Sequence, residues 1–125
     1  MTTFLLATTS VHTTAAAADY LQTRLGPEDS VTVLGVVTAE TPDRDLDDAV
    51  NVARARLAPA TVTIERREST PSTAITTVAD DIDADEILLG PRRGTPTQRG
   101  QPGLGSTAAA VAGDSDRPVL VVPSR

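Results

Sequence analysis

The chain has 125 residues, which is enough for one domain built around one hydrophobic core. It is acidic, with 17 aspartates and glutamates against 11 basic residues, and this balance argues against broad nucleic-acid binding, because phosphate neutralisation needs a basic face. The chain has no cysteine and a single histidine, His12, which excludes disulfides, thiolate metal sites and multi-histidine metal centres.

Five short apolar runs predict strands. In chain order they are Phe4–Ala7, Val31–Val37, Thr61–Glu65, Glu86–Leu89 and Pro118–Val122. Two of these runs are apolar without alternation, which is typical of parallel strands that are covered on both faces.

Helical periodicity separates the five runs. The predicted helices are Thr13–Leu25, Arg44–Leu57, a third from Pro71 to Ile82, and Ser106–Ala112. Asp43 is expected to cap the second helix, and Pro71 suits the first position of the third. Gly113 is expected to end the fourth helix, because glycine is the commonest stop residue.

Alternating strands and helices predict a parallel sheet with right-handed crossovers. We therefore expect one domain, residues 1–125, with a three-layer α/β/α sandwich and two helices on each face of the sheet. The expected sheet is five-stranded and Rossmann-like, with strand order 3-2-1-4-5. The stretch Gly90–Gly105 is the one long segment without a regular pattern, and such a segment in a compact domain is usually functional.

Ligands of open α/β sheets bind beyond the carboxyl ends of the strands, where the strand order reverses. Gly90–Gly105 follows the fourth strand and would lie there. It contains five glycines and three arginines but no carboxylate, and a helix begins at Ser106. Glycine lets the backbone approach a phosphate, a helix start offers unpaired N–H groups, and arginine adds charge. The segment is therefore a candidate phosphate-binding loop, with a solvated connector as the alternative.

The second half of the chain resembles the universal stress protein family. After the fourth strand that family carries Gly-x2-Gly-x9-Gly-Ser/Thr, then a short helix and a last strand that begins Pro-Val-Leu. The matching residues here are Gly90, Gly94, Gly105, Ser106 and the run Pro118-Val119-Leu120. All the predicted strands and helices follow the family's order. The resemblance thus covers nearly the whole chain and implies the adenine nucleotide α-hydrolase-like form of the fold.

The resemblance also implies a nucleotide site. The residues that would cradle phosphates are Gly90, Arg92, Gly94, Gly105, Ser106 and Thr107. Val36 matches the position whose backbone meets adenine. ATP-binding members carry an aspartate after the first strand, where this chain has Thr8 and Thr9, and both gaps of the glycine motif are one residue longer here. These departures make the ATP-binding motif degenerate.

Two functions follow from the resemblance. The first is a stress-response protein that binds a nucleotide or phosphate weakly, with ATP and magnesium as the possible cofactors. Such a protein would hydrolyse ATP slowly at most, so no catalytic residue is assigned. The second is a member that binds no ATP and acts as a dimeric protein-interaction module. In either case the resemblance implies a homodimer in which the apolar edge strand Pro118–Val122 pairs with its copy.

Two other kinds of protein share the predicted architecture. A receiver domain needs an aspartate after the third strand and a lysine after the fifth, but here Arg66 and Arg67 follow the third strand and lysine is absent. A flavodoxin-like protein is suggested by the hydroxyl-rich Thr8–Thr13, yet flavin rings usually stack between aromatics and only Phe4 and Tyr20 are present. His12 either touches a phosphate or is simply exposed.

The composition further predicts a habitat and a compartment. All 11 basic residues are arginines and 12 of the 17 acidic residues are aspartates, which resembles proteins of salt-loving archaea. The aspartates at positions 80, 81, 83 and 85 are interpreted as hydrating the end of the third helix. No apolar run approaches the roughly 20 residues that span a membrane, and the start lacks the features of a signal peptide. We expect a haloarchaeal, cytoplasmic protein without membrane or nucleic-acid partners.

Overall fold

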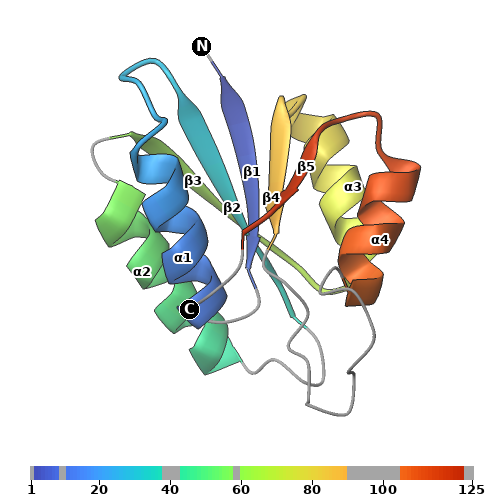
Figure 1. Ribbon diagram of the computed structural model, residues 1–125. Coiled ribbons are helices and arrows are strands. Elements are labelled where there is room, and N and C mark those ends of the chain that lie inside the picture. Colours follow the sequence, from blue (N-terminus) through green and yellow to red (C-terminus); the bar gives the residue numbers. More distant parts are fainter. Residues whose placement is uncertain (1, 9–10, 38–42, 58–59, 90–104, 123–125) are drawn as a thin grey trace.

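Strands and helices alternate in the computed structural model, which describes residues 2–8, 11–37, 43–57, 60–89 and 105–122 (Figure 1). The elements are β1 (Thr3–Thr8), α1 (Val11–Gln22), β2 (Ser30–Val36), α2 (Asp43–Leu57), β3 (Thr61–Arg67), α3 (Pro71–Ile82), β4 (Glu86–Leu89), α4 (Gly105–Asp114) and β5 (Val119–Val121). Every expected strand and helix of the sequence prediction is present, with boundaries that shift by a few residues.

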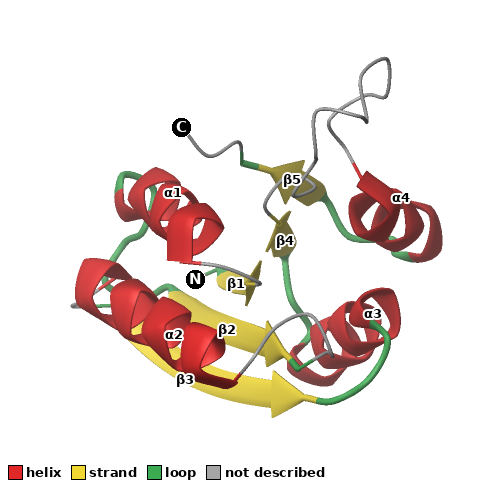
Figure 2. Ribbon diagram, turned by 90° about the horizontal axis from the view of Figure 1, so that it is seen from below, coloured by secondary structure: helices red, strands yellow, loops and turns green. Residues whose placement is uncertain are grey.

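The five strands form one parallel sheet in the order β3-β2-β1-β4-β5, which confirms the predicted order. The central strand β1 pairs with β2 on one side and β4 on the other, so that Leu6 lies between Val33 and Leu88. Helices α1 and α2 cover one face and α3 and α4 cover the other, as Figure 2 shows. The predicted three-layer sandwich is therefore confirmed.

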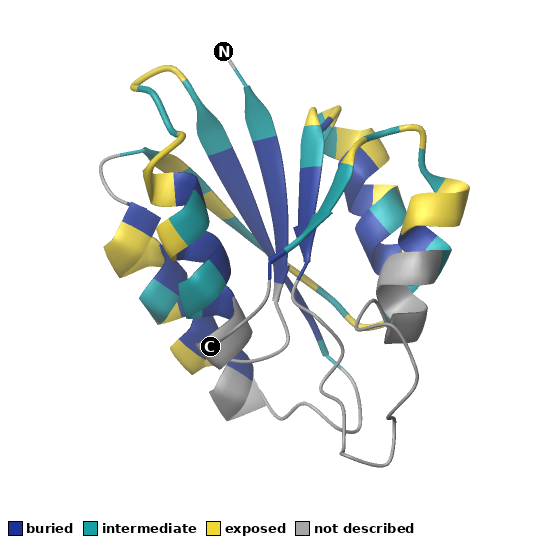
Figure 3. Ribbon diagram, viewed as in Figure 1, coloured by how far each residue is buried: buried dark blue, intermediate teal, exposed yellow. Residues whose placement is uncertain are grey.

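Strands β1, β2, β4 and β5 each supply side chains to two separate cores, because successive residues of a strand point to opposite faces. In β1, Phe4 and Leu6 belong to the cluster beneath α1 and α2, whereas Leu5 and Ala7 belong to the cluster beneath α3 and α4. The middle of the sheet is buried on both faces (Figure 3). This double burial explains why the central runs of the sequence are apolar without alternation.

The end of the last helix differs from its sequence prediction. The prediction that Gly113 ends the last helix is wrong, because α4 continues to Asp114 and the Ser115 N–H donates to the Val111 carbonyl at 2.9 Å. Gly113 does not adopt the left-handed conformation in which a glycine usually ends a helix. Helix α3 ends at Ile82 as predicted, and the residue that caps it is Asp83, a non-glycine residue in the left-handed conformation with φ of 53°. Aspartate is one of the few residues that tolerate this conformation.

None of the helices in the described part of the chain combines the length and the apolar character that a membrane span requires.

Candidate functional site

The strand order reverses at the centre of the sheet. From β1 the chain continues to β2 and β3 on one side, and β4 and β5 lie on the other. The strands are parallel, so the carboxyl ends of β1, at Thr8, and of β4, at Leu89, lie at the same end of the sheet, which is the lower end in Figure 1. A reversal of this kind leaves a crevice where α/β proteins bind ligands.

Two helix starts lie at this end of the sheet. Helix α1 begins at Val11, three residues after β1 ends, and α4 begins at Gly105. Both helices run back along the strands on opposite faces of the sheet, and Figure 1 shows their first turns at the lower end. The first N–H groups of a helix lack partners within the helix, and the macrodipole makes them attractive to anions. The crevice is therefore flanked by two groups of main-chain donors.

The side chain of Val36 is part of the core, with 2% of its surface exposed. Its main chain is placed by the alternation of β2. The Ser30 N–H donates to the Thr2 carbonyl on the β1 side at 2.9 Å, and the Val37 N–H donates to the Arg67 carbonyl on the β3 side at 2.8 Å. Successive residues of a strand direct their polar groups to opposite neighbours, so Val36 directs its carbonyl toward the β1 side.

The level of this carbonyl along the sheet is set by the register. Gly35 pairs with Thr8, the last residue of β1. Val36 is one residue further along, so its carbonyl faces the position just beyond the end of β1, at the reversal of strand order. A main-chain acceptor of β2 is thus directed toward the same end of the sheet as the two helix starts.

The sequence-predicted site residues fall into two groups. Five of them lie in described elements at the crevice end of the sheet: Thr8, Val36, Gly105, Ser106 and Thr107. The last three form the first turn of α4, where their N–H groups are available to a ligand. Thr9, Gly90, Arg92 and Gly94 lie outside the described residues, so their roles stay predictions.

The charged groups near this end are engaged with one another. Arg66, at the end of β3, forms an ion pair with Asp47 of α2, and Arg67 places Nη1 2.9 Å from Glu65 Oε1. Within the described ranges, no group of three or more histidines or acidic residues could hold a metal ion. What these ranges offer a ligand is main-chain hydrogen bonding, which suits binding rather than proton transfer.

The opposite end of the sheet holds carboxylates that fix loops. Asp29 accepts hydrogen bonds from the Gly26 N–H at 2.8 Å and the Thr2 N–H at 2.7 Å, and these bonds, that of Gly26 first, lower the pKa of its carboxyl group from its ordinary value. The Thr3 N–H likewise donates to Asp85 at 2.8 Å. A depressed pKa means that this contribution to stability is present above the unfolded value and is lost as pH falls through the folded one.

Sequence reasoning overlooked Arg117, which also lies at that opposite end. Its side chain is 19% exposed and contacts two carboxylates of α3. An arginine directly before Pro118 at the start of the last strand was the available signal, but its partners are 34 and 37 residues away in the sequence. Distant pairing of this kind is visible only in the folded chain.

Comparison with known proteins gives a family and a fold. The model of the universal stress protein family matches residues 7–123. No curated protein matches significantly. The solved structure of the hypothetical protein MJ0577 superposes with a TM-score of 0.80 at 20% identity, covering 99% of this chain and 96% of that one.

Two ligand-bound structures are also similar. A universal stress protein in complex with cAMP has a TM-score of 0.72 at 22% identity, with 99% and 98% of the two chains covered. The universal stress protein from Archaeoglobus fulgidus in complex with dAMP has a TM-score of 0.64 at 20% identity, with 98% of each chain covered. At these identities the likeness establishes the fold.

Proposed function

We propose a function from the premise that this chain belongs to the universal stress protein family: it is a stress-response protein that binds an adenine nucleotide at the carboxyl end of its sheet. The observation that carries the proposal is the convergence of the Val36 carbonyl and the first turn of α4 on one crevice. The carbonyl can accept from the amino group of adenine, and the N–H groups of residues 105–107 can donate to phosphate oxygens. Similar folds in complex with cAMP and dAMP support this assignment.

The proposed binding is weak. A carboxylate after β1 would accept strong charge-assisted hydrogen bonds from a ribose, whereas Thr8 and Thr9 offer neutral hydroxyls. The glycine motif that includes Gly90 and Gly94 has one more residue in each gap than the family pattern. ATP with magnesium is the proposed ligand, Arg92 adds charge at its phosphates, and hydrolysis is slow at most.

A second candidate function is a dimeric protein-interaction module that binds no ATP. The observation that favours it is the position of β5 at the edge of the sheet, with three half-buried apolar residues. We propose a homodimer through Pro118–Val122 for either function. We also propose that the protein is cytoplasmic and haloarchaeal.

A calorimetric titration with ATP and magnesium chloride in molar potassium chloride tests the nucleotide site. Proline is tolerated in the first turn of a helix but removes one N–H donor. Ser106→Pro is therefore expected to weaken ATP binding about tenfold, since a hydrogen bond to a charged group contributes about 1.5–3 kcal/mol.

The control is Ser72→Pro, because Ser72 is the second residue of α3 just as Ser106 is the second residue of α4. We expect this control to leave the affinity unchanged. Absence of heat from the unaltered chain with millimolar ATP, AMP and cAMP would contradict the nucleotide site and leave the interaction module. Equal weakening by both substitutions would place the phosphates elsewhere.

Thermal melts at 0.1 M and 3 M potassium chloride test the haloarchaeal assignment. The chain carries a formal charge of −6, and the repulsion among its carboxylates acts over a Debye length of about 10 Å at 0.1 M but only about 3 Å at 1 M. We expect the melting temperature to rise in high salt.

A variant with fewer carboxylates serves as the control for this salt effect. Replacing the exposed Asp48, Asp114 and Asp116 with asparagine removes three of the negative charges, and we expect the rise in melting temperature to shrink. Equal melting temperatures of the unaltered chain at both salt concentrations would refute the assignment.

A further inference from the structure

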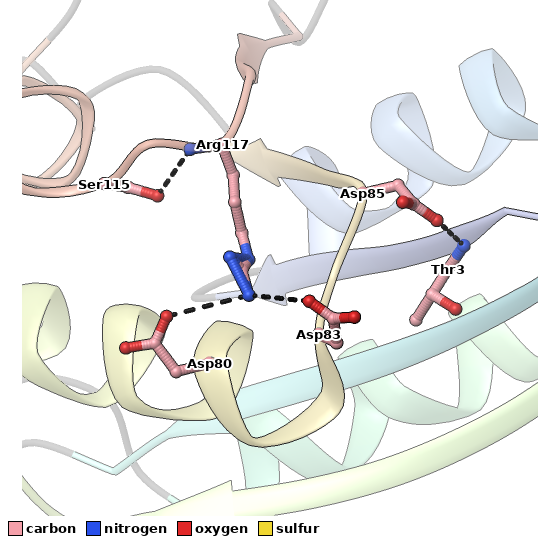
Figure 4. A network of polar contacts seen from close by, with 6 residues as sticks. All are labelled: Thr3, Asp80, Asp83, Asp85, Ser115 and Arg117. Atoms are coloured by element: carbon pink, nitrogen blue, oxygen red, sulfur yellow. Dashed lines mark hydrogen bonds and ion pairs between the residues drawn. The ribbon is translucent and has the colours of Figure 1, made fainter.

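One end of helix α3 is tied to both edges of the sheet. The edge strands are β3 and β5, which lie far apart on either side of β1. Arg67, the last residue of β3, places Nη2 4.0 Å from Asp81 Oδ2. Arg117, just before β5, places Nη2 3.2 Å from Asp83 Oδ1 and 3.7 Å from Asp80 Oδ1 (Figure 4). Three of the four aspartates that the sequence interpretation assigned to hydration, Asp80, Asp81 and Asp83, thus form ion pairs.

The position of these carboxylates explains why cations are needed there. The C-terminal end of a helix carries a partial negative charge, so aspartates in its last turn are unfavourable unless a cation compensates them. Asp80 and Asp81 occupy that turn of α3, and Asp83 follows it directly. Arginine suits such a position because its planar guanidinium can serve more than one carboxylate.

Arg117 is the more deeply placed of the two arginines. Its side chain is 19% exposed, compared with 40% for Arg67. Its Nε is buried and has no hydrogen-bond partner among the residues that the structure describes. A guanidinium that has lost this much solvation is stabilised chiefly by its carboxylate partners, so removal of those partners leaves it poorly compensated.

The backbone of Arg117 is fixed as firmly as its side chain. Its N–H donates to Ser115 Oγ at 3.1 Å, which turns the chain from the end of α4 toward β5. The next residue, Pro118, accepts a hydrogen bond from the Ile87 N–H at 2.9 Å, which is the first contact between β4 and β5. The ion pairs therefore lie one residue from the point where β5 joins the sheet.

In the described chain β5 has a neighbouring strand on one side alone. The strand has three residues, pairs with β4 alone, and leaves all three side chains half-buried. Helix α4 packs on α3 and β5 but has few contacts with the central strands. Residues 105–122 thus form a unit, here called the C-terminal unit, that touches the rest of the fold chiefly through α3 and β4. Units with few buried contacts are those that open locally.

We propose that Arg117 is an electrostatic latch for the C-terminal unit. Its ion pairs with Asp80 and Asp83 hold α4 and β5 closed against α3, and the unit opens by itself when these pairs are broken. Opening displaces the start of α4, at the proposed phosphate site, together with the edge strand β5. The latch itself depends only on the contacts of Arg117 and stands whether or not a nucleotide binds.

Hydrogen exchange of the full chain, followed by mass spectrometry, tests the latch. Arg117→Met keeps the apolar length of the side chain and removes its charge. We expect exchange in residues 110–122 to accelerate about tenfold, because a hydrogen bond between charged groups is lost, while β1 and β2 keep their rate. The matched control is Arg56→Met, which breaks an exposed pair with Asp19 at 2.5 Å between α2 and α1 and is expected to leave residues 110–122 unchanged.

A second variant decides the matter if Arg117→Met does not fold. Asp83 is 98% exposed, and asparagine tolerates its left-handed conformation, so Asp83→Asn removes the partner charge with little strain. The latch predicts a selective acceleration from Asp83→Asn that is smaller than that from Arg117→Met, because Arg117 keeps its pair with Asp80, and no further acceleration when Asp83→Asn is added to a folded Arg117→Met. It also predicts that the effect of Asp83→Asn shrinks in molar salt, which screens ion pairs. Unchanged exchange in residues 110–122, or equal acceleration in β1 and β2, would overturn the proposal.

Discussion

Val121→Pro is expected to halve the molar mass of the protein measured by light scattering in high salt. The Pro118 carbonyl and the Val122 N–H bond to β4, so by alternation the N–H of Val121 points away from β4, to the outer edge of the sheet. Proline at this position removes an outward donor and leaves the β4 bonds intact. The substitution therefore blocks pairing between two copies of β5 while keeping β5 in its own sheet.

The control lies at the opposite edge. The Arg67 carbonyl accepts from β2, so the N–H of the preceding Arg66 points outward from β3. Arg66→Pro should leave the molar mass unchanged if the dimer forms through β5. A monomeric unaltered chain at tens of micromolar would disprove the dimer, and dissociation by Arg66→Pro alone would move the interface to β3.

The structure also changes how the interface is best tested. The side chain of Val121 packs against the core beneath α3 and α4. A charged residue there would disturb that core as well as any interface, because burial of an unpaired carboxylate is costly. Removing the backbone donor of Val121 affects pairing between two copies of β5 without placing a charge in the core. A charged side chain at this position would affect both.

Leu6→Ala is expected to lower the free energy of unfolding by about 2–5 kcal/mol. Leu6 is fully buried in the central strand, and its neighbours in the register, Val33 and Leu88, are also fully buried. Neither neighbour can move into the space without disturbing a second strand, so a cavity remains and adds to the lost burial. Urea denaturation at fixed salt measures the change.

Leu25→Ala deletes the same atoms from a different environment. Leu25 packs on the same core cluster but is only partly buried, in the segment between α1 and β2. Solvent and loop atoms can fill the space that Leu25→Ala leaves. We therefore expect Leu25→Ala to lower the free energy of unfolding clearly less than Leu6→Ala does. If the two substitutions lowered the free energy of unfolding equally, burial in the sheet would not determine the stability of this fold.

Strand and helix positions could be predicted from the sequence because the signals are local. A run such as Phe4–Ala7 is apolar at consecutive positions, and this alone indicates a strand covered on both faces. Pro71 fixed the start of α3 because proline removes only a donor that the first turn does not use. Alternation of these elements, with right-handed crossovers, then left few possible strand orders.

The candidate site could be predicted in part for the same reason. The strand order brings the ends of β1, β2 and β4 together, so Thr8, Val36 and the first turn of α4 lie at one end of the sheet. The roles of these residues, and those of Gly90 and Arg92, stay predictions. The direction of the Val36 carbonyl could not be predicted, because it depends on the register with β1 and β3.

The sequence by itself determined the family, the order of the elements and the apolar faces, since each of these follows from residues close together in the chain. Only the tertiary structure decided that α4 runs past Gly113, that Asp83 caps α3 in the left-handed conformation, and that Arg117 reaches Asp80 and Asp83. The physical reason is that an aspartate run looks like a solvated surface until a distant arginine is placed against it. Arg117 is the arginine that contacts these aspartates because the pairing of β5 with β4 places the residue before β5 next to the end of α3.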